Sequence, residues 1–255
     1  MRYFLSLYLL LFSVLFFPPK STASEKEKRH EPLSIRREKG ELVFAGDEKE
    51  PFTGIFLKKY PDGKLEELYE YKDGKEYGAF KRWYPNGQLE REKNIRDNVF
   101  KTWYESGKQK MVIYFEQGTE ERVELKWYEN EQLETKKVFS KGKRHGLFKK
   151  WYKNGQLQLE FTFQNGKEEG LSSTYHDNGK LKIETNYKNG IKHGAAKRWY
   201  KNGILKALGH FKNGQLHGVF KSWDEKGILL SENRWDNGLP VKKVTGETSD
   251  KKEKK

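Results

Sequence analysis

Apolar and polar residues alternate along short segments of this chain with a period of two. In segment 156–164, apolar side chains occupy every second position and polar side chains fill the positions between them. This pattern is typical of a strand with one half-buried face. Segment 146–152, just before it, carries aromatic side chains at positions that point to opposite faces. The pattern therefore predicts β-strands that place apolar surface on both sides of a sheet.

Asn-Gly pairs separate these segments at steps that alternate between 11 and 13 residues. The pairs in the clearest part of the chain are Asn154-Gly155, Asn165-Gly166, Asn178-Gly179, Asn189-Gly190, Asn202-Gly203 and Asn213-Gly214. Such a pair between apolar-alternating segments predicts a hairpin turn of type I′, in which both central residues have positive φ. Two turns in every 24 residues predict one β-hairpin per repeat, and consecutive hairpins predict a β-meander.

The repeats fill residues 40–241, as an N-terminal half-unit at about 40–53 followed by eight units. The units begin near Gly54, Gly78, Asn98, Arg122, Gly146, Gly170, Gly194 and Gly218. We therefore predict an all-β fold, an elongated single-layer antiparallel meander of about eight 24-residue β-hairpin repeats, stabilised by contacts between neighbouring repeats. In the fourth unit Glu131 replaces the turn glycine, and we expect a local irregularity there.

The composition agrees with a thin, highly exposed folded sheet. Of the 255 residues, 35% are charged and 15% are aromatic, and the formal net charge is +14. Disordered chains are charged but poor in aromatic residues, whereas a compact domain of this size carries more aliphatic core. The chain has no cysteine, which excludes disulfides, thiolate metal sites and lipidation at cysteine.

Both ends of the chain differ from the repeats. Residues 1–23 combine Arg2, a nearly uninterrupted 15-residue apolar run and small residues at 21–23, which is the layout of a secretory signal peptide. The run is shorter than the roughly 20 apolar residues of a membrane-spanning helix. We therefore expect cleavage, no transmembrane span in the mature form, and export to the periplasm, the cell surface or the medium; an uncleaved N-terminal anchor is the alternative. Residues 24–39 and 242–255 are charged and without period, and are predicted to be a disordered leader and a disordered Lys/Glu-rich tail.

Alignment of the repeats shows columns of identical residue types, and two columns are candidates for a binding face. The tryptophan column contains Trp83, Trp103, Trp127, Trp151, Trp199 and Trp223. The lysine column on the same predicted face contains Lys81, Lys101, Lys149, Lys197 and Lys221. A further basic column, on the opposite predicted face, contains Lys58, Arg82, Lys126, Lys150 and Arg198.

Cations interleaved with aromatic rings fit a protein partner or, alternatively, an anionic lipid or glycan. Single-stranded nucleic acid is bound by similar chemistry, but the predicted export disfavours it as a target. A plainer interpretation is that the lysines keep an exposed sheet soluble and block pairing at its edges.

No group of residues has the spacing of a catalytic or cofactor site. His145, His193 and His217 precede the glycines that begin three repeats, which fits the repeat pattern better than a zinc site that lacks a third ligand. Ser172 lacks the Gly-x-Ser-x-Gly motif and occupies an ordinary column position of the repeat. There is no phosphate-binding loop and no dinucleotide motif. We therefore expect no catalytic residue, no metal, no cofactor and no enzymatic activity.

The pattern Gly-x-Phe-Lys-x-Trp-Tyr-x-Asn-Gly-x-Leu, followed by Phe-x-Asn-Gly-Lys-x-x-Gly, resembles the MORN-repeat variant of bacterial YwqK-type proteins. The resemblance covers about 40–241 and implies stacked β-hairpins in one elongated sheet that binds proteins or lipid surfaces. It also implies an antitoxin-like role, since YwqK-type members are classed as antitoxins of toxin–antitoxin pairs. Together with the predicted export, it implies a non-enzymatic exported scaffold for a protein partner, with a toxin as one candidate in an immunity-like role. An envelope-associated protein that binds anionic lipid or glycan through its basic columns is the alternative.

Overall fold

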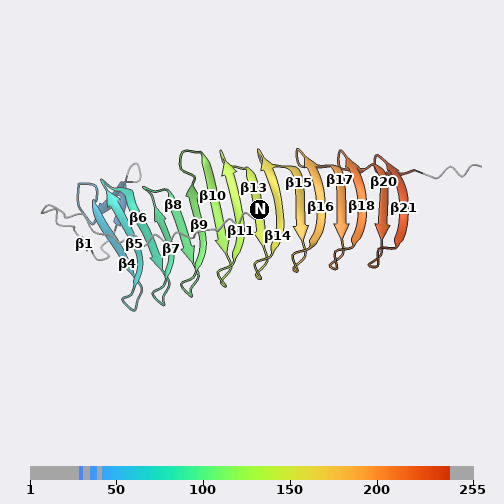
Figure 1. Cartoon of the computed structure of the whole chain (residues 1–255). Helices are drawn as coiled ribbons and strands as arrows, with labels where there is room; N and C mark the ends of the chain where they lie inside the picture. The colour runs from blue at the N-terminus through green and yellow to red at the C-terminus, as the bar shows by residue number, and fades with distance from the viewer. Residues whose placement is uncertain (1–28, 31–34, 39–41, 242–255) are drawn as a thin grey trace, which may run out of the picture.

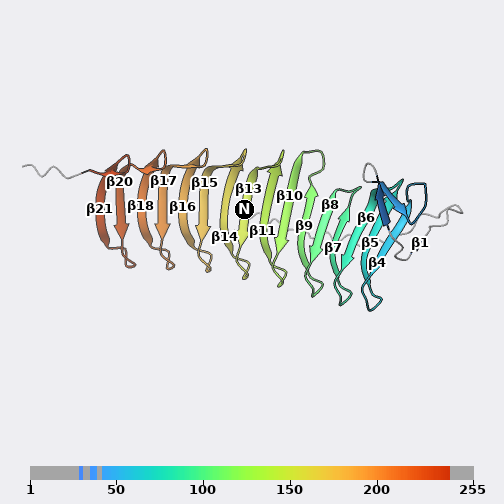
Figure 2. The same cartoon turned by 180° about the vertical axis from the view of Figure 1, so that it is seen from behind.

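The computed structural model describes residues 29–30, 35–38 and 42–241, and the regular structure in these residues is β-sheet throughout. Consecutive strands run up and down beside one another and form one long sheet with a single layer (Figures 1 and 2). This arrangement confirms the predicted all-β meander. The predicted signal peptide at 1–23 and the predicted tail at 242–255 lie outside the described residues.

The meander runs from β4 to β22, and neighbouring strands pair antiparallel. Its first half consists of β4 (Gly54–Lys59), β5 (Leu65–Lys72), β6 (Lys75–Trp83), β7 (Leu89–Asn94), β8 (Val99–Trp103), β9 (Gln109–Phe115), β10 (Glu121–Trp127) and β11 (Leu133–Ser140). Its second half consists of β12 (Lys143–Arg144), β13 (Gly146–Trp151), β14 (Leu157–Gln164), β15 (Lys167–Tyr175), β16 (Leu181–Lys188), β17 (Ile191–Trp199), β18 (Leu205–Lys212), β19 (Gln215–Leu216), β20 (Gly218–Trp223), β21 (Leu229–Asp236) and β22 (Leu239–Pro240). One-residue breaks at His145 and His217 separate β12 from β13 and β19 from β20.

Three further strands lie at the N-terminal end. β1 (Arg29–His30) pairs with β4 in parallel, and β2 (Ile35–Glu38) pairs with β3 (Leu42–Ala45) in a separate two-stranded sheet. β1 and β2 fall within segment 24–39, for which the sequence predicted disorder. Pairing at a sheet edge uses backbone hydrogen bonds, so the composition of a segment does not reveal it.

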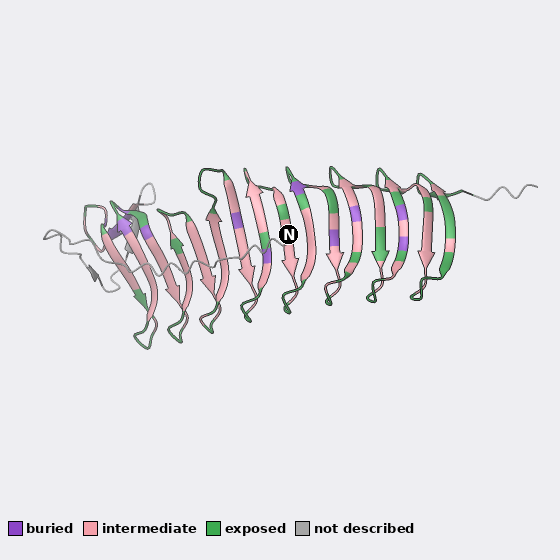
Figure 3. Cartoon of the chain, in the orientation of Figure 1, coloured by how far each residue is buried: buried purple, intermediate pink, exposed green. Residues whose placement is uncertain are grey.

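Burial is shallow along the sheet because a single layer leaves both faces accessible. Most strand residues are half-buried (Figure 3), and no large side chain of the described residues is completely buried. The densest packing forms a cap at the N-terminal end, where Val43, Phe52 and Tyr71 are 3%, 4% and 5% exposed. The Val43 N–H donates to the carbonyl of Gly74 at 2.9 Å, which ties the cap to the first hairpin. The half-unit predicted at 40–53 therefore covers one end of the meander.

In the repeats with an Asn-Gly pair at both turns, the two turns differ, whereas the sequence predicted type I′ for both. Asn165 and Gly166 both have positive φ, 52° and 84°, as type I′ requires. In the Asn154-Gly155 pair only the glycine has positive φ, at 81°, and its N–H donates to the carbonyl of Tyr152 at 2.9 Å. That geometry is a type I turn followed by a left-handed glycine. For the Asn-Gly pairs named above, the prediction was therefore correct at Asn165-Gly166, Asn189-Gly190 and Asn213-Gly214 and wrong at Asn154-Gly155, Asn178-Gly179 and Asn202-Gly203.

Asparagine serves a different purpose in this second kind of turn. Asn154 Oδ1 accepts a hydrogen bond from the N–H of Gln156 at 3.0 Å, and its Nδ2 donates to the carbonyl of Asp177 in the next repeat at 2.8 Å. The same inter-repeat bond joins Asn86 to Glu105, Asn130 to Lys153, Asn178 to Lys201 and Asn202 to Glu225. The asparagine column thus links the turns of neighbouring repeats.

The tyrosine column links the strands of neighbouring repeats. The Tyr152 hydroxyl donates to the carbonyl of Tyr175, one repeat later, at 2.9 Å. Equivalent bonds of 2.6 to 3.0 Å join Tyr60 to Trp83, Tyr84 to Trp103, Tyr104 to Trp127, Tyr128 to Trp151 and Tyr200 to Trp223. His176 replaces tyrosine in this column, and its Nε2 lies 3.2 Å from the carbonyl of Trp199. Because a carbonyl oxygen only accepts, this Nε2 carries the proton and donates.

Glu131 keeps the turn of the glycine-containing repeats, contrary to the irregularity expected there. Its N–H donates to the carbonyl of Tyr128 at 2.9 Å, and its φ is 66°. This left-handed conformation costs a non-glycine residue roughly 1–2 kcal/mol. We therefore predict that Glu131→Gly raises the free energy of unfolding by about 1 kcal/mol, measured by chemical denaturation. Gly155→Glu, the reverse change in the next repeat, is expected to lower it by a similar amount, and a loss of stability in Glu131→Gly would contradict the argument.

Candidate functional site

The structure places the tryptophan and lysine columns on one face of the sheet, named here the Trp face. Each tryptophan ends the first strand of its hairpin, and five of the six follow a column lysine by two residues, which puts both on the same side of a strand. Tyr175 takes the tryptophan position in its own repeat, and its hydroxyl donates to Glu160 at 2.8 Å, while Glu160 forms an ion pair with Lys149. Burial, together with this hydrogen bond, raises the pKa of Tyr175. The six tryptophans are half-buried.

Glutamates on the intervening strands neutralise part of the lysine column. The ion pairs are Lys81–Glu92 at 3.1 Å, Lys149–Glu160 at 3.2 Å and Lys221–Glu232 at 3.1 Å. Lys101 and Lys197 form no ion pair within the described residues. The sequence columns did not reveal these partners, because the glutamates belong to the second strand of each hairpin and become neighbours only through the antiparallel register. The Trp face therefore carries charges of both signs.

A line of exposed aliphatic side chains runs beside the charged row of the Trp face. Leu147, Leu171 and Val219 are 43%, 49% and 43% exposed. Leu147 and Val219 each lie two residues before a column lysine, so they point to the same side as that lysine. The tryptophans lie on the other side of the charged row. This line is not among the columns predicted from the sequence, although Leu147 and Leu171 are one repeat apart.

On the opposite face, cations of the N-terminal half are paired with carboxylates. The contacts are Lys58–Glu66 at 3.0 Å, Arg82–Glu66 at 3.8 Å, Arg82–Glu67 at 3.8 Å, Arg82–Glu90 at 3.2 Å and Lys126–Glu134 at 2.8 Å. Glu66 and Glu67 are consecutive and yet both approach Arg82. The pairing register shifts opposite them, between Lys58 and Lys59, which puts both side chains on this face.

Aromatic rings fill the same face next to these ion pairs. The ring centroids of Tyr69 and Phe80 are 4.7 Å apart, and those of Tyr69 and Phe56 are 6.1 Å apart. Burial, together with the neighbouring Glu67 carboxylate, raises the pKa of Tyr69 to about 12. This part of the face is therefore packed with aromatic rings, and its cations are paired with carboxylates.

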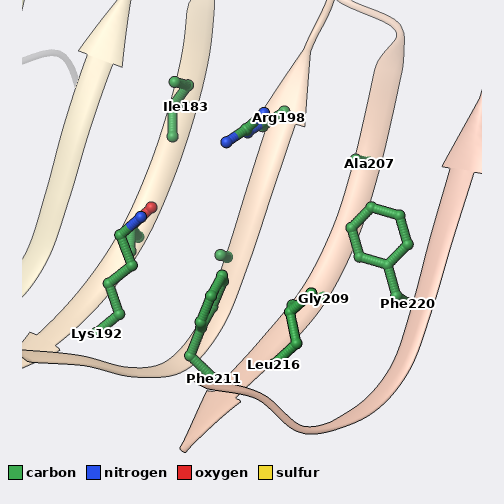
Figure 4. Close-up of a pocket in the computed structure, with 10 residues that line it drawn as sticks. Ile183, Lys192, Arg198, Ala207, Gly209, Phe211, Leu216 and Phe220 are labelled. Carbon is green, nitrogen blue, oxygen red and sulfur yellow. The ribbon is translucent and has the colours of Figure 1, made fainter. Parts of the chain in front are cut away.

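The C-terminal half of the opposite face contains a hollow of about 170 Å³. Its lining side chains come from β16 to β20 (Figure 4). They are Ile183, Thr185, Lys192, Ala196, Arg198, Ala207, Gly209, Phe211, Leu216 and Phe220. One member of this set, Arg198, belongs to the second basic column predicted from the sequence. The hollow was not predicted, because it arises from small residues on three separate strands.

The histidines and Ser172 do not come together in a site. In the described part of the chain, no three histidine or acidic side chains lie close enough to hold a metal ion. His145 and His217 occupy the strand breaks, where their N–H groups donate to Val138 and His210, and His217 Nδ1 lies 3.2 Å from an Asp236 carboxylate oxygen. Ser172 pairs in register with Thr185. Over the described ranges, no helix is long and apolar enough to cross a membrane.

One protein family matches the repeat architecture of the chain. The MORN repeat variant family matches residues 52–73, 76–97, 144–165, 168–189, 192–213 and 216–237. No curated protein is significantly similar to the chain. Among solved structures, a protein of unknown function from Bacteroides fragilis shares 10% identity over 73% of this chain and 95% of its own length, with a TM-score of 0.13. Because six hairpin repeats match one family over just over half of the residues, the chain belongs to the MORN repeat variant family.

Proposed function

We propose that this chain is a non-enzymatic repeat scaffold that binds a protein partner through its Trp face. The observation that carries the proposal is the line of Leu147, Leu171 and Val219, each more than two-fifths exposed, which runs parallel to the tryptophan column. Aliphatic and aromatic side chains in contiguous rows on an exposed surface are typical of protein interfaces. The hydrogen bonds that the tyrosine and asparagine columns make between repeats hold these rows at fixed spacing. The side chains of the Trp face therefore lose little conformational freedom when a partner binds.

The charges of the Trp face favour a protein over a membrane or a polyanionic glycan. An anionic surface attracts a row of a single sign. Three of the five column lysines pair with glutamates instead. The row therefore contains both cations and carboxylates, which can pair with opposite charges on a partner. Alternating charges of this kind suit a protein surface, on which they fix register and exclude wrong partners.

The proposal extends to the compartment and to the class of partner. The signal-peptide pattern of residues 1–23 supports a site of action outside the cytoplasm. The resemblance to YwqK-type proteins supports an antitoxin-like or immunity-like relationship, in which the partner is a toxin. Both extensions rest on sequence, and the Trp-face proposal stands without either of them.

Replacement of two tryptophans tests the proposed face. Trp151→Ala with Trp199→Ala is expected to weaken partner binding at least tenfold, because truncation of a tryptophan that anchors an interface costs more than about 1 kcal/mol. The measurement is the dissociation constant for the captured partner, with folding checked by circular dichroism. Lys150→Ala, on the opposite face and outside the hollow, serves as the matched control and is expected to leave this affinity unchanged. Undiminished affinity in the folded double variant would show that the Trp face is not the binding site.

A further inference from the structure

We propose that the hollow on the opposite face binds an aromatic side chain of a partner protein, with a carboxylate beside that side chain held by Arg198. This would be a second binding site. It does not depend on the Trp-face proposal, because its side chains project from the other side of the sheet.

Small residues create the hollow at positions where another repeat of the same chain has phenylalanines. In the repeat that begins at Gly146, Phe148 and Phe161 face each other with ring centroids 5.0 Å apart. Two repeats later the same two positions hold Ala196 and Gly209. Ala196 therefore leaves open the place that the Phe148 ring occupies two repeats earlier, and an aromatic ring from outside fits there.

The size of the hollow limits what can enter. Its volume of about 170 Å³ is below the roughly 300–1,000 Å³ of sites that enclose drug-sized ligands. It suits one side chain rather than a whole small molecule. An anchor residue seated in a pocket of this kind is a common centre of a protein interface.

The walls of the hollow suit an aromatic ring. A Cβ atom at Gly209 would lie 3.0 Å from Phe220 Cδ2, so the Phe220 ring lies directly over this glycine. The Lys192 Nζ lies 5.3 Å from the centroid of the Phe211 ring. Ala207 is 8% exposed, and it contributes apolar lining as well. An incoming ring would contact two phenyl groups in the offset or edge-to-face arrangements that aromatic pairs prefer.

Arg198 provides the charge that selects a carboxylate. In the N-terminal half, each of Lys58, Arg82 and Lys126 pairs with a glutamate eight residues later in the sequence. For Arg198 the position eight residues later is Lys206, whose Nζ lies 4.9 Å from the centroid of the Tyr200 ring. Arg198 is exposed and forms no ion pair within the described residues.

The neighbouring repeats reinforce this charge. Lys182 takes the glutamate position one repeat earlier, and Gln158 takes it one repeat before that. The ion-pair pattern that balances the N-terminal half of this face is therefore absent around the hollow. Arginine offers a planar pair of donors to a carboxylate, which gives charge-assisted hydrogen bonds. The partner segment thus carries an aromatic residue flanked by Asp or Glu.

Fluorescein-labelled peptides test this assignment on the protein chain itself. The probe is Gly-Glu-Phe-Asp-Gly, and matched peptides replace Phe by Ala or replace Glu and Asp by Gln and Asn. Fluorescence anisotropy gives the affinities, and amide chemical shifts locate the bound probe. We expect each matched peptide to bind about tenfold more weakly than the probe, with the largest shifts at Ala196, Gly209 and Phe220.

Two protein variants separate shape from charge. Ala196→Phe installs the residue that positions 148 and 220 carry, so it is expected to fold and to abolish peptide binding. Arg198→Gln is expected to weaken the acidic probe about tenfold and to leave the Gln/Asn peptide unchanged. The double variant Trp151→Ala with Trp199→Ala is expected to bind the probe normally, so a failure of the Trp-face proposal is distinguishable from a failure here.

Three results would overturn the assignment. The first is no binding of the probe at millimolar concentration. The second is that the Ala196→Phe variant still binds the probe peptide, or that the protein binds phosphatidylglycerol vesicles and not the peptide. The third is self-association of the chain that Ala196→Phe removes, since the occupant of the hollow would then be a second copy.

Discussion

Tyr71→Ala is expected to lower the stability of the N-terminal repeats by about 3 kcal/mol, the largest single-residue effect that we predict. Tyr71 is 5% exposed, and its ring centroid lies 6.0 Å from that of Phe52 and 6.1 Å from that of Tyr69. Removal of this ring leaves a cavity between the cap and the first hairpin. Hydrogen exchange, read repeat by repeat, measures the loss, because repeats in a one-dimensional stack can open separately.

Tyr187→Ala provides the matched control. Tyr187 occupies the same position near the end of the second strand of its hairpin as Tyr71 does, but it is half-buried and lies far from the cap. We expect this variant to lose clearly less stability and to lose it locally, around β16. An equal loss in both variants would contradict the view that the cap at 42–53 is the best packed part of the sheet.

Replacement of two residues of the tyrosine column, Tyr128→Phe with Tyr152→Phe, is expected to lower the free energy of unfolding by about 2 kcal/mol. The hydroxyls donate to the carbonyls of Trp151 and Tyr175 at 2.9 Å each. Each bond is worth roughly 0.5–1.5 kcal/mol, and its loss leaves a part-buried carbonyl without this donor. Chemical denaturation followed by tryptophan fluorescence measures the change.

Tyr187→Phe is the control for the tyrosine-column variant. Burial is the main cause that raises the pKa of Tyr187, and its hydroxyl forms no hydrogen bond within the described ranges. Loss of this hydroxyl is therefore expected to change stability by less than about 0.5 kcal/mol. If Tyr128→Phe with Tyr152→Phe proved as stable as this control, the tyrosine hydrogen bonds between repeats would contribute nothing to the free energy of unfolding.

Much of the fold was predictable from the sequence, because repetition amplifies weak local signals. One Asn-Gly pair is a modest turn signal, but pairs at regular steps define the hairpins, the meander and the faces. The identical spacing concealed one difference, since Asn165 takes positive φ and Asn154 does not. The two turns are distinguished by the hydrogen bonds that each asparagine makes, and these depend on the neighbouring repeat.

The candidate sites were less predictable, because they depend on which residues become neighbours across strands. The tyrosine column can be seen in the sequence, but its hydrogen bonds cannot. They form because the fold places each hydroxyl beside the backbone carbonyl at the tryptophan position of the next repeat. The lysine column appeared purely basic until the register placed Glu92, Glu160 and Glu232 beside it. The hollow depends on Ala196 and Gly209, which are inconspicuous in sequence and matter because phenylalanines fill their places two repeats earlier.

Affinity capture from the native cell envelope and medium is the decisive experiment on whether this sheet binds a protein. The bait is the form that begins at Ser24, and the bound material is identified by mass spectrometry at low and at high salt. We expect one dominant protein that stays bound at high salt, because apolar contacts of the Trp face are not screened by ions as charge contacts are. Retention of anionic lipid or glycan at low salt alone, with no protein at high salt, would contradict it.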